Sequence, residues 1–368
     1  MTKKLMYVWL FAMCIVLFSA ISIYAKDNVR GDFFIKNIVI NGERIINYNL
    51  QYSIVLYNET MYIPLTSEMR EIFGVELEVD WESHTIKLLQ VEPTRKNISE
   101  NWIKNDANPL FLNVIPDATV LAFAQAISDE GDYEQTDEIE LPELRVQEID
   151  LNDMPLLEKD RQIYVPLRAI ANNELFDWDI YYDSYYGVCI STDSSIPAKT
   201  FVNKGEALEN RGFVRYIRHY NSRLTTSYAQ QLVFLFRRAG EVFDVSPRLL
   251  MAVAHRESTF NCGAIGRGGS AGLMQIMPAT GARRGLTPEQ LLDPKTSIDF
   301  GAMYLSERLV AHNGDWILAL SAYNQGATAV NRGRHTTTYA NRVMSAYHGI
   351  DNFLRIHGFV IDYPYNAN

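Results

Sequence analysis

The spacing of hydrophobic residues changes near the middle of the chain and separates two kinds of structure. In the first half, segments such as residues 75–79 (VELEV) alternate apolar and polar positions, the period that buries one face of a β-sheet. From Ser227 onward, apolar residues recur every three or four positions, as they do on amphipathic helices. The pattern therefore predicts a multidomain chain, in which an N-terminal α+β module is followed by an all-α domain.

The first residues follow a third pattern. Lys3 and Lys4 precede a run, residues 5–25, that contains no charged side chain. A short positive segment before an apolar run is typical of an export signal, and residues 23–25 (IYA) resemble a signal-peptidase site. The run is long for a signal peptide, so a membrane anchor formed by residues 5–25 is the alternative. We expect the protein to be exported and to act in the cell envelope, in the periplasm or the cell wall.

Two segments of the first half resemble each other. The motif YIPL at residues 62–65 returns as YVPL at residues 164–167, and DWES at residues 80–83 returns as YYDS at residues 181–184. Each copy predicts a strand, a short helix (residues 66–73 and 168–175) and a second strand. Since neither copy can bury its apolar face alone, we expect the copies to pack against each other.

This pair of copies, over residues 37–195, resembles the copper amine oxidase N-terminal-like domain, a stalk-type repeat. The family name suggests copper, but His84 is the only histidine before residue 200, so no cluster of copper ligands can form. The acidic insert between the copies, residues 128–150, lacks the spacing of a calcium loop and is interpreted as a solvated loop. We therefore expect no cofactor and no metal site.

The second half contains a carboxylate where its helical pattern predicts an apolar side chain. Ser246 and Pro247 are an N-cap and a first helical residue, and they predict a helix that ends near residue 258. Its apolar stripe passes through Leu250 and Ala254 and reaches Glu257. Burial of a carboxylate disfavours its charged form and raises its pKa, as a general acid at neutral pH requires. The alternative is that Glu257 turns outward into solvent at the helix end.

Groups suited to a sugar polymer follow in the sequence. Five glycines lie in residues 263–272, and no strand or Lys-Ser/Thr pair accompanies them, which argues against a phosphate-binding loop. Residues 273–278 (LMQIMP) place an amide among large apolar groups, and residues 322–326 (AYNQG) end a later helix. Amides, a tyrosine and glycines around one desolvated carboxylate favour a neutral ligand rich in hydroxyl and acetamido groups.

The motifs ESTFN (residues 257–261), GLMQIMP (272–278) and AYNQG (322–326) resemble, in this order, the three signature motifs of the soluble lytic transglycosylases, a lysozyme-like family that cleaves peptidoglycan. The resemblance covers about residues 227–348. The expected organisation is a signal peptide or anchor (1–25), the stalk module (37–195), a linker with a connecting helix (196–224), a lytic transglycosylase domain (225–350) and a C-terminal tail (351–368).

The resemblance implies a reaction and a set of roles. The substrate would be the peptidoglycan glycan strand, cut at the β-1,4 bond between N-acetylmuramic acid and N-acetylglucosamine to leave 1,6-anhydromuramoyl ends. Glu257 would be the sole catalytic acid and base, and the substrate-binding residues would be Ser258 near the cleaved bond, Met274 and Gln275 along the glycan groove, Tyr323 hydrogen-bonded to Glu257, and Asn324 at the N-acetyl group. Two departures from the family accompany these roles. Threonines precede Tyr339 where the family often has an acidic residue, so Tyr339 receives no role, and Ser297 replaces an Asn as a predicted helix cap.

Two other functions compete with this one. A hydrolytic muramidase would need a second carboxylate to activate water, and the nearby candidates are Asp293, Asp299 and Asp315. Asp293 and Asp315 are interpreted as structural residues of a turn and a helix cap, whereas Asp299 has no assigned role. The other competitor is a wall protein that binds glycan without cutting it.

Charge supports a wall polymer as partner. The net charge is +5 over residues 205–368, with sixteen arginines and one lysine, and −17 over residues 26–204. The basic half suits an anionic polymer, and an exported, net acidic chain is a poor candidate for nucleic-acid binding. The histidines of the second half show no metal-ligand spacing, and Cys189 and Cys262 are expected to remain unpaired. Protein partners and oligomeric state do not follow from the sequence.

Overall fold

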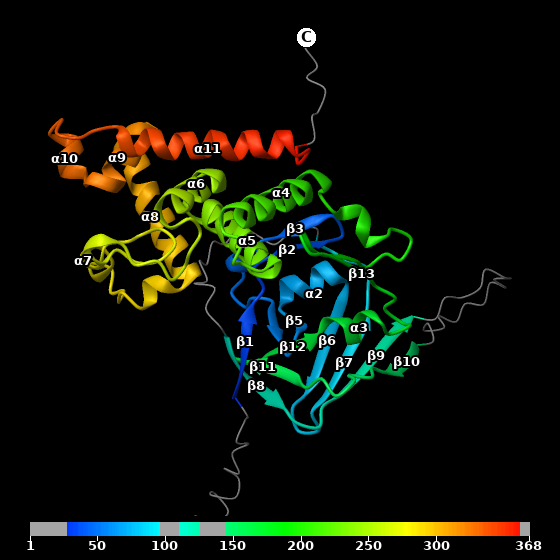
Figure 1. The fold of residues 1–368 in the computed structure, drawn as a ribbon. Helices are drawn as coiled ribbons and strands as arrows, with labels where there is room; N and C mark the ends of the chain where they lie inside the picture. Colours follow the sequence, from blue (N-terminus) through cyan, green and yellow to red (C-terminus); the bar gives the residue numbers. More distant parts are fainter. Residues whose placement is uncertain (1–27, 96–109, 126–143, 361–368) are drawn as a thin grey trace, which may run out of the picture. The chain divides into compact units, whose positions relative to one another are not determined.

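In the computed structural model, the chain is described over residues 28–95, 110–125 and 144–360, and it divides into two compact units (Figure 1). Within these residues, the first unit comprises 28–34, 38–181 and 189–200, and the second comprises 35–37, 182–188 and 201–360. The predicted export segment and most of the acidic insert lie outside the described residues. No helix among the described residues is long and apolar enough to span a membrane.

The first unit is built on β-strands. A closed barrel joins, in order, β1 (Asn28–Phe33), β4 (Val55–Tyr57), β5 (Thr60–Pro64), β12 (Gln162–Pro166), β11 (Leu156–Lys159) and β8 (Leu110–Ile115). The described neighbours in the barrel pair antiparallel. Its interior is filled by five buried side chains: Val55, Tyr62, Leu112, Leu157 and Tyr164.

Two four-stranded sheets and three short helices complete the strand-rich part. One sheet has the order β10 (Leu144–Glu148), β9 (Thr119–Gln125), β7 (Thr85–Gln90) and β6 (Val75–Asp80). The other has the order β13 (Asp179–Asp183), β14 (Gly187–Ser191), β2 (Asn37–Ile40) and β3 (Glu43–Ile45). The short helices are η1 (Asn47–Asn49), α2 (Ser67–Phe73) and α3 (Leu167–Ala171).

The two similar segments contain the same elements in the same order. The segments β5–α2–β6 and β12–α3–β13 follow the same order, and β5 pairs with β12 so that Ile63 lies opposite Val165. The two tyrosine-containing strands therefore lie side by side in the barrel wall. The second helix ends at Ala171, earlier than predicted, because the Asn173 side chain accepts a hydrogen bond from the Leu175 N–H and starts a turn. The likeness to the stalk family stays a prediction.

The second unit is helical, as predicted. Its main helices are α4 (Lys204–Tyr220), α5 (Thr226–Phe243), α6 (Pro247–Ser258), α8 (Pro294–Ala311), α9 (Trp316–Gln325) and α11 (Thr338–Ile356). Its shorter helical segments are η3 (Arg267–Gly269), α7 (Pro278–Ala282), η4 (Gln290–Leu292) and α10 (Ala327–Asn331). One further turn, η2 (Ala198–Phe201), lies where the first unit ends and the second resumes. Over residues 201–360, β-pairing is limited to two isolated bridges at Ala271, with Ile265 and with Ile276.

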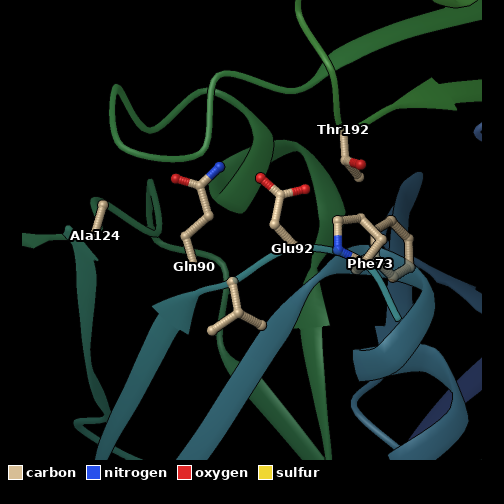
Figure 2. A pocket seen from close by; sticks show the side chains of 7 residues that line it. Phe73, Gln90, Glu92, Ala124 and Thr192 are labelled. Carbon is tan, nitrogen blue, oxygen red and sulfur yellow. The ribbon is translucent and has the colours of Figure 1, made fainter. Parts of the chain in front are cut away.

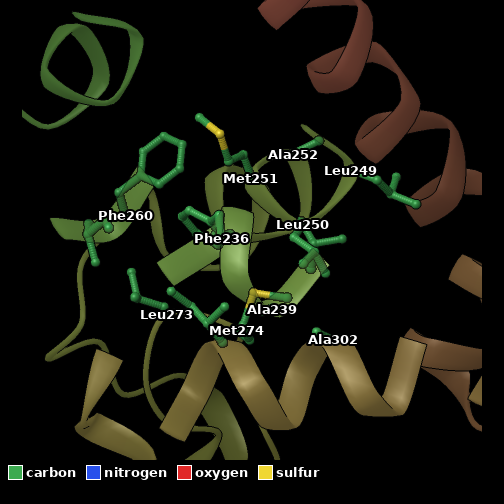
Figure 3. Packing of buried hydrophobic residues seen from close by; sticks show 14 of the residues in the cluster. Phe236, Ala239, Leu249, Leu250, Met251, Ala252, Phe260, Leu273, Met274 and Ala302 are labelled. Carbon is green, nitrogen blue, oxygen red and sulfur yellow. The ribbon is translucent and has the colours of Figure 1, made fainter. Parts of the chain in front are cut away.

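Helix α6 runs through the centre of this unit's core. Residues 249–254 are all fully buried, so the helix is surrounded on every side (Figure 3). Phe236 and Ala239 of α5 and Ala302 of α8 belong to the same cluster. A helix with no solvent face over six residues is held firmly by packing, so its last turn is a rigid support for the side chains it carries.

The helical unit extends beyond the predicted boundaries on both sides. Helix α4, predicted as a connecting helix in the 196–224 linker, contributes four buried residues (Phe213, Val214, Tyr216 and Ile217) to the same core. At the other end, α11 continues to Ile356 and buries Leu354, so residues 351–356 are not a tail. In α4, three arginines and other polar residues obscure an apolar stripe that tertiary packing uses.

The helix caps predicted at Ser246 and Asp315 are present, and they accept hydrogen bonds from the backbone N–H groups of Leu249 and Leu318. Asp293, predicted to lie in a turn, also caps a helix, since it accepts from the Thr296 N–H at the start of α8. Thr287 and Gln290 form a capping box, in which each side chain accepts a hydrogen bond from the backbone N–H of the other residue. That box starts only the single turn η4, because Asp293 and Pro294 begin the next helix directly afterwards.

Gly272 provides a test of the close packing behind the glycine-rich loop. Its φ is +81°, and a Cβ there would lie 1.9 Å from the carbonyl oxygen of Leu291. We expect Gly272→Ala to lower the free energy of unfolding by at least about 2 kcal/mol in urea denaturation, because the backbone must move. Gly285→Ala is the matched control, since its φ is +75° with open space around it, and should cost only about 1 kcal/mol. Equal losses in the two variants would show that the close approach carries no cost.

Candidate active site

Glu257 lies in the last turn of α6, where the helix end is fixed by the residues that follow it. Thr259 and Phe260 both have positive φ, 52° and 58°, and the Thr259 N–H bonds back to helix carbonyls. Such a conformation is rare for a β-branched residue and ends the helix sharply. Phe260 is completely buried and anchors the turn in the core. The half-buried Glu257 side chain therefore stands on a helix end that cannot move freely.

Tyr339 is the hydrogen-bond partner of Glu257. Its hydroxyl donates to Glu257 Oε1 at 2.6 Å from the first turn of α11. The sequence motifs gave Tyr339 no role, because threonines precede it. The sequence did contain one indication that Tyr339 faces the core. It lies one turn before Val343 and two turns before Ala346, on the buried stripe of α11.

The prediction that Tyr323 hydrogen-bonds Glu257 is wrong in this structure. The Tyr323 hydroxyl donates instead to the carbonyl oxygen of Met274 at 3.0 Å, and its ring packs edge-on against Tyr304 at 5.5 Å. Burial and the negative charge of Glu257 raise the pKa of Tyr323 well above the ordinary value, so its hydroxyl stays neutral. It thus ties the 272–278 segment to α9 and forms a neutral wall beside Glu257.

Burial dominates the electrostatics of Glu257. It raises the pKa of this carboxyl above the ordinary value, while the hydrogen bond from Tyr339 and the positive charge of Arg256 oppose the rise. Among the described residues, Arg256 is the only charged side chain that contributes to this shift. Glu257 is therefore an isolated carboxyl group whose protonated form is favoured by its surroundings.

Ser258 joins α6 to the glycine-rich segment. Its hydroxyl lies 3.1 Å from the carbonyl oxygen of Ala254 and 2.9 Å from that of Leu273. The single O–H is shared between these acceptors, so the oxygen lone pairs remain open to a ligand. The structure thus places Ser258 directly next to Glu257 and in contact with the second motif.

Met274 and Gln275, the two residues of the 272–278 motif predicted to line the groove, have structural roles instead. Met274 is completely buried, so its side chain cannot line a groove. Gln275 uses its amide inside the loop: Nε2 donates to the carbonyl oxygens of Ala264 and Gly272 at 3.0 and 2.9 Å, and Oε1 accepts from Ser270 Oγ at 2.7 Å. The methionine on the surface is Met277, which is 46% exposed. The motif contains both methionines, and only the backbone path decides which one faces outward.

Ser297 bonds to the backbone of the 272–278 motif and does not cap α8. Its hydroxyl, fully buried, accepts a hydrogen bond from the Met274 N–H at 3.1 Å. The cap of α8 is Asp293, four residues earlier. The predicted cap at Ser297 is therefore wrong, and the physical role of this hydroxyl is to satisfy a buried backbone donor.

The third motif places two residues with different duties. Asn324 is exposed near the C-terminal end of α9 and is free to meet a ligand. The neighbouring Gln325 pairs with the backbone of Thr336 in both directions, at 2.7 and 2.9 Å. This pairing fixes the segment that leads into α11 and so helps to place Tyr339.

The three aspartates weighed as a second catalytic carboxylate all have structural partners. Asp293 and Asp315 cap α8 and α9. Asp299 forms an ion pair with the buried Arg238 at 2.7 Å and a second one with Lys295 at 3.2 Å. The structure therefore gives Asp299 the role that the sequence left open, and it is a structural one.

Other titratable groups of the described residues form no further site of this kind. No group of three or more His, Cys, Asp or Glu side chains in this part of the chain is placed to hold a metal ion. Neither Cys189 nor Cys262 forms a disulfide with a described residue, and the Tyr228 hydroxyl donates to Cys262 Sγ at 3.2 Å. His255, two residues before Glu257, bonds Tyr216 through Nδ1 at 2.7 Å in an aromatic cluster.

Comparison with known proteins finds a family match within the helical unit. Residues 234–344 match the family described as "Transglycosylase SLT domain". The chain is 38% identical over 106 residues to the transglycosylase of Enterobacteria phage PRD1, covering 29% of this chain and 39% of that protein. It is 37% identical over 102 residues to the soluble lytic murein transglycosylase of Salmonella typhimurium, covering 25% of this chain and 16% of that protein.

A solved structure is also similar over part of its length. The 70 kDa soluble lytic transglycosylase of Escherichia coli shares 23% identity, with a TM-score of 0.32, and the match covers 43% of this chain and 32% of that one. The chain spans less than half the length of each of these relatives. The motifs that surround Glu257 all lie inside the matched segment, and residues 234–344 of this chain are a transglycosylase SLT domain.

Proposed function

We propose that this domain cleaves the glycan strands of peptidoglycan as a lytic transglycosylase, with Glu257 as its single general acid and base. One observation carries the proposal: Glu257 is a desolvated carboxyl group, hydrogen-bonded by Tyr339, and the nearby aspartates are occupied elsewhere. The names of the relatives agree with this reaction class.

The first step uses the raised pKa of Glu257. A carboxyl group whose pKa is raised holds its proton more firmly and can donate it to the oxygen that joins N-acetylmuramic acid to N-acetylglucosamine. The bond from C1 of the muramoyl sugar to that oxygen breaks, and N-acetylglucosamine leaves with a hydroxyl group. The Tyr339 hydroxyl, 2.6 Å from Oε1, stabilises the carboxylate that remains.

The second step returns the proton. The Glu257 carboxylate accepts it from the C6 hydroxyl of the same muramoyl sugar, and O6 bonds to C1 to give the 1,6-anhydro end. The attacking oxygen belongs to the substrate itself, so its effective concentration is high and no second carboxylate is needed to activate water. Glu257 finishes in its protonated form, ready for another cycle.

Binding roles follow from which side chains are accessible. Asn324 is exposed and suits the N-acetyl group, and Ser258 offers its oxygen beside the cleaved bond. Met277 replaces Met274 as the apolar contact, because it is the exposed methionine of the motif. Gln275 shapes the loop, and Tyr323 excludes water from one side of Glu257. The exported location, the signal or anchor at residues 5–25 and the attraction of the basic half to an anionic wall belong to the same proposal.

Replacement of the acid tests the central assignment. We expect Glu257→Gln to lower the rate of glycan cleavage by about a thousandfold or more, while binding of the strand persists.

The Glu257→Gln variant should also be more stable than the wild type at neutral pH. In the wild type, the pKa of Glu257 is higher in the folded protein than in the unfolded chain. Above the unfolded-state pKa, ionisation of Glu257 therefore lowers the free energy of unfolding, and a neutral glutamine avoids this loss. A Tm gain of about 2–4 °C at pH 7 should vanish at acidic pH, as calorimetry can show. Unchanged turnover would refute the catalytic role.

Removal of one hydroxyl tests the role of Tyr339 as a positioning residue. In Tyr339→Phe, the carboxylate loses its hydrogen bond, so the pKa of Glu257 should rise further. The alkaline limb of the pH–rate profile should move to higher pH, while kcat falls by about tenfold or more because the acid is no longer oriented. Tyr347→Phe on the same helix is the control and should leave the profile unchanged. A profile identical to wild type in Tyr339→Phe would exclude the proposed link.

The products separate transglycosylation from hydrolysis. Purified sacculi digested with the protein should release muropeptides with anhydro ends, which are one water lighter than reducing ends in mass spectrometry. Reducing ends as the main product would favour the hydrolytic muramidase. No release of muropeptides by a folded protein that binds the sacculi would favour a glycan-binding wall protein.

A further inference from the structure

The first unit contains a cavity that no part of the glycan reaction uses. Its volume is about 420 Å³, within the range of small-molecule sites, and it lies where β7 ends, beside the C-terminal end of α2 (Figure 2). Phe73 and Pro93 give it an apolar side. Three polar side chains also line it: Gln90, Glu92 and Thr192.

Two of the polar side chains, those of Gln90 and Glu92, come from neighbouring positions of the chain. Gln90 is the last residue of β7 and Glu92 lies two residues further along, the spacing at which side chains of an extended chain point to the same side. Figure 2 shows the Gln90 amide and the Glu92 carboxylate directed together toward the segment that bears Thr192. Together they present a carboxylate, an amide oxygen and a hydroxyl oxygen to one space.

Thr192 is held in place by an asparagine from the β2–β3 turn. Asn41 Oδ1 accepts from the Thr192 N–H at 2.9 Å, and Asn41 Nδ2 donates to Thr192 Oγ1 at 2.9 Å. The same nitrogen reaches the carbonyl oxygen of Ile72, at 3.4 Å, on the helix that ends with Phe73. One wall of the cavity is thus organised before any ligand arrives, and the Thr192 oxygen keeps a lone pair for it.

We propose that this cavity binds a primary ammonium group, carried by a lysine-like amino acid or by the side chain of a short peptide. An –NH₃⁺ group has three N–H donors and no acceptor, which matches the three oxygens of Glu92, Gln90 and Thr192. The apolar side, Phe73 and Pro93, suits the methylene chain that carries such a group.

The positive charge of Arg145, near the cavity, further restricts which ammonium compounds fit. Arg145 of β10 lies opposite Ala124 of β9, and Ala124 lines the cavity. Residues opposite each other on paired strands share one face of the sheet, so Arg145 stands near the rim. A ligand with a carboxylate besides its ammonium group therefore fits better than a simple polyamine. Glu92 is the charged side chain of the lining itself, so an anion without an ammonium group is disfavoured.

Binding of Nα-acetyl-lysine to the full-length protein tests this inference by calorimetry or ligand-observed NMR. We expect saturable binding with a Kd below about 1 mM, and at least tenfold weaker binding after acetylation of the ε-amino group. Glu92→Gln keeps the size of the side chain and should weaken binding about tenfold or more. Glu82→Gln, an equal charge change in the exposed β6–β7 turn, should leave it unaltered.

The contrary results are equally clear. Equal affinity for the ε-acetylated compound, equal binding by Glu92→Gln and wild type, or no saturation up to about 10 mM ligand would each overturn the proposed site. The inference does not depend on glycan cleavage: Glu257→Gln should bind Nα-acetyl-lysine as wild type does, and Glu92→Gln should release muropeptides at the wild-type rate. Failure of one proposal therefore leaves the other open to its own test.

Discussion

The withdrawal of one carboxyl group from water is the constraint on which the active site depends. Glu257 is desolvated because it ends a helix that the core surrounds on every side, and Phe260 anchors the turn behind it. A folded protein gains no stability from such a group at neutral pH, since burial disfavours its charged form. The hydrogen bond from Tyr339 and the charge of Arg256 reduce this cost without abolishing it.

The rest of the helical unit serves the placement of that group. Ser258, Tyr323 and Ser297 each bond to the backbone of residues 273–274, so three elements hold the glycine-rich segment against the end of α6. Gln325 fixes the backbone of Thr336 and thereby the start of the helix that carries Tyr339. Many of the motif residues thus form hydrogen bonds within the domain. Fewer of them are available to a ligand than the sequence motifs predict. This arrangement agrees with a site in which positions are set before substrate binds.

The strand-rich unit uses its repeat in a different way. The two copies pair through β5 and β12 in a barrel, whereas the cavity near Glu92 is built from one copy together with Asn41 and Thr192. The symmetry of the repeat is therefore broken where the cavity forms. A barrel with a filled interior offers no room of its own for a ligand, so the space arises at the ends of the neighbouring strands.

The sequence by itself determined the division into a strand-rich and a helical part, the likeness of the two N-terminal segments, the helix caps at Ser246 and Asp315 and the exceptional position of Glu257. These features depend on local periodicity and on capping chemistry, which act over a few residues. Tertiary structure alone decided the partner of Glu257, the burial of Met274 rather than Met277, the use of the Gln275 amide inside its loop and the inclusion of α4 in the core. Tyr339 lies 82 positions from Glu257 along the chain, and no local rule specifies which of two tyrosines reaches a carboxylate from such a distance. That choice is made when the helices pack.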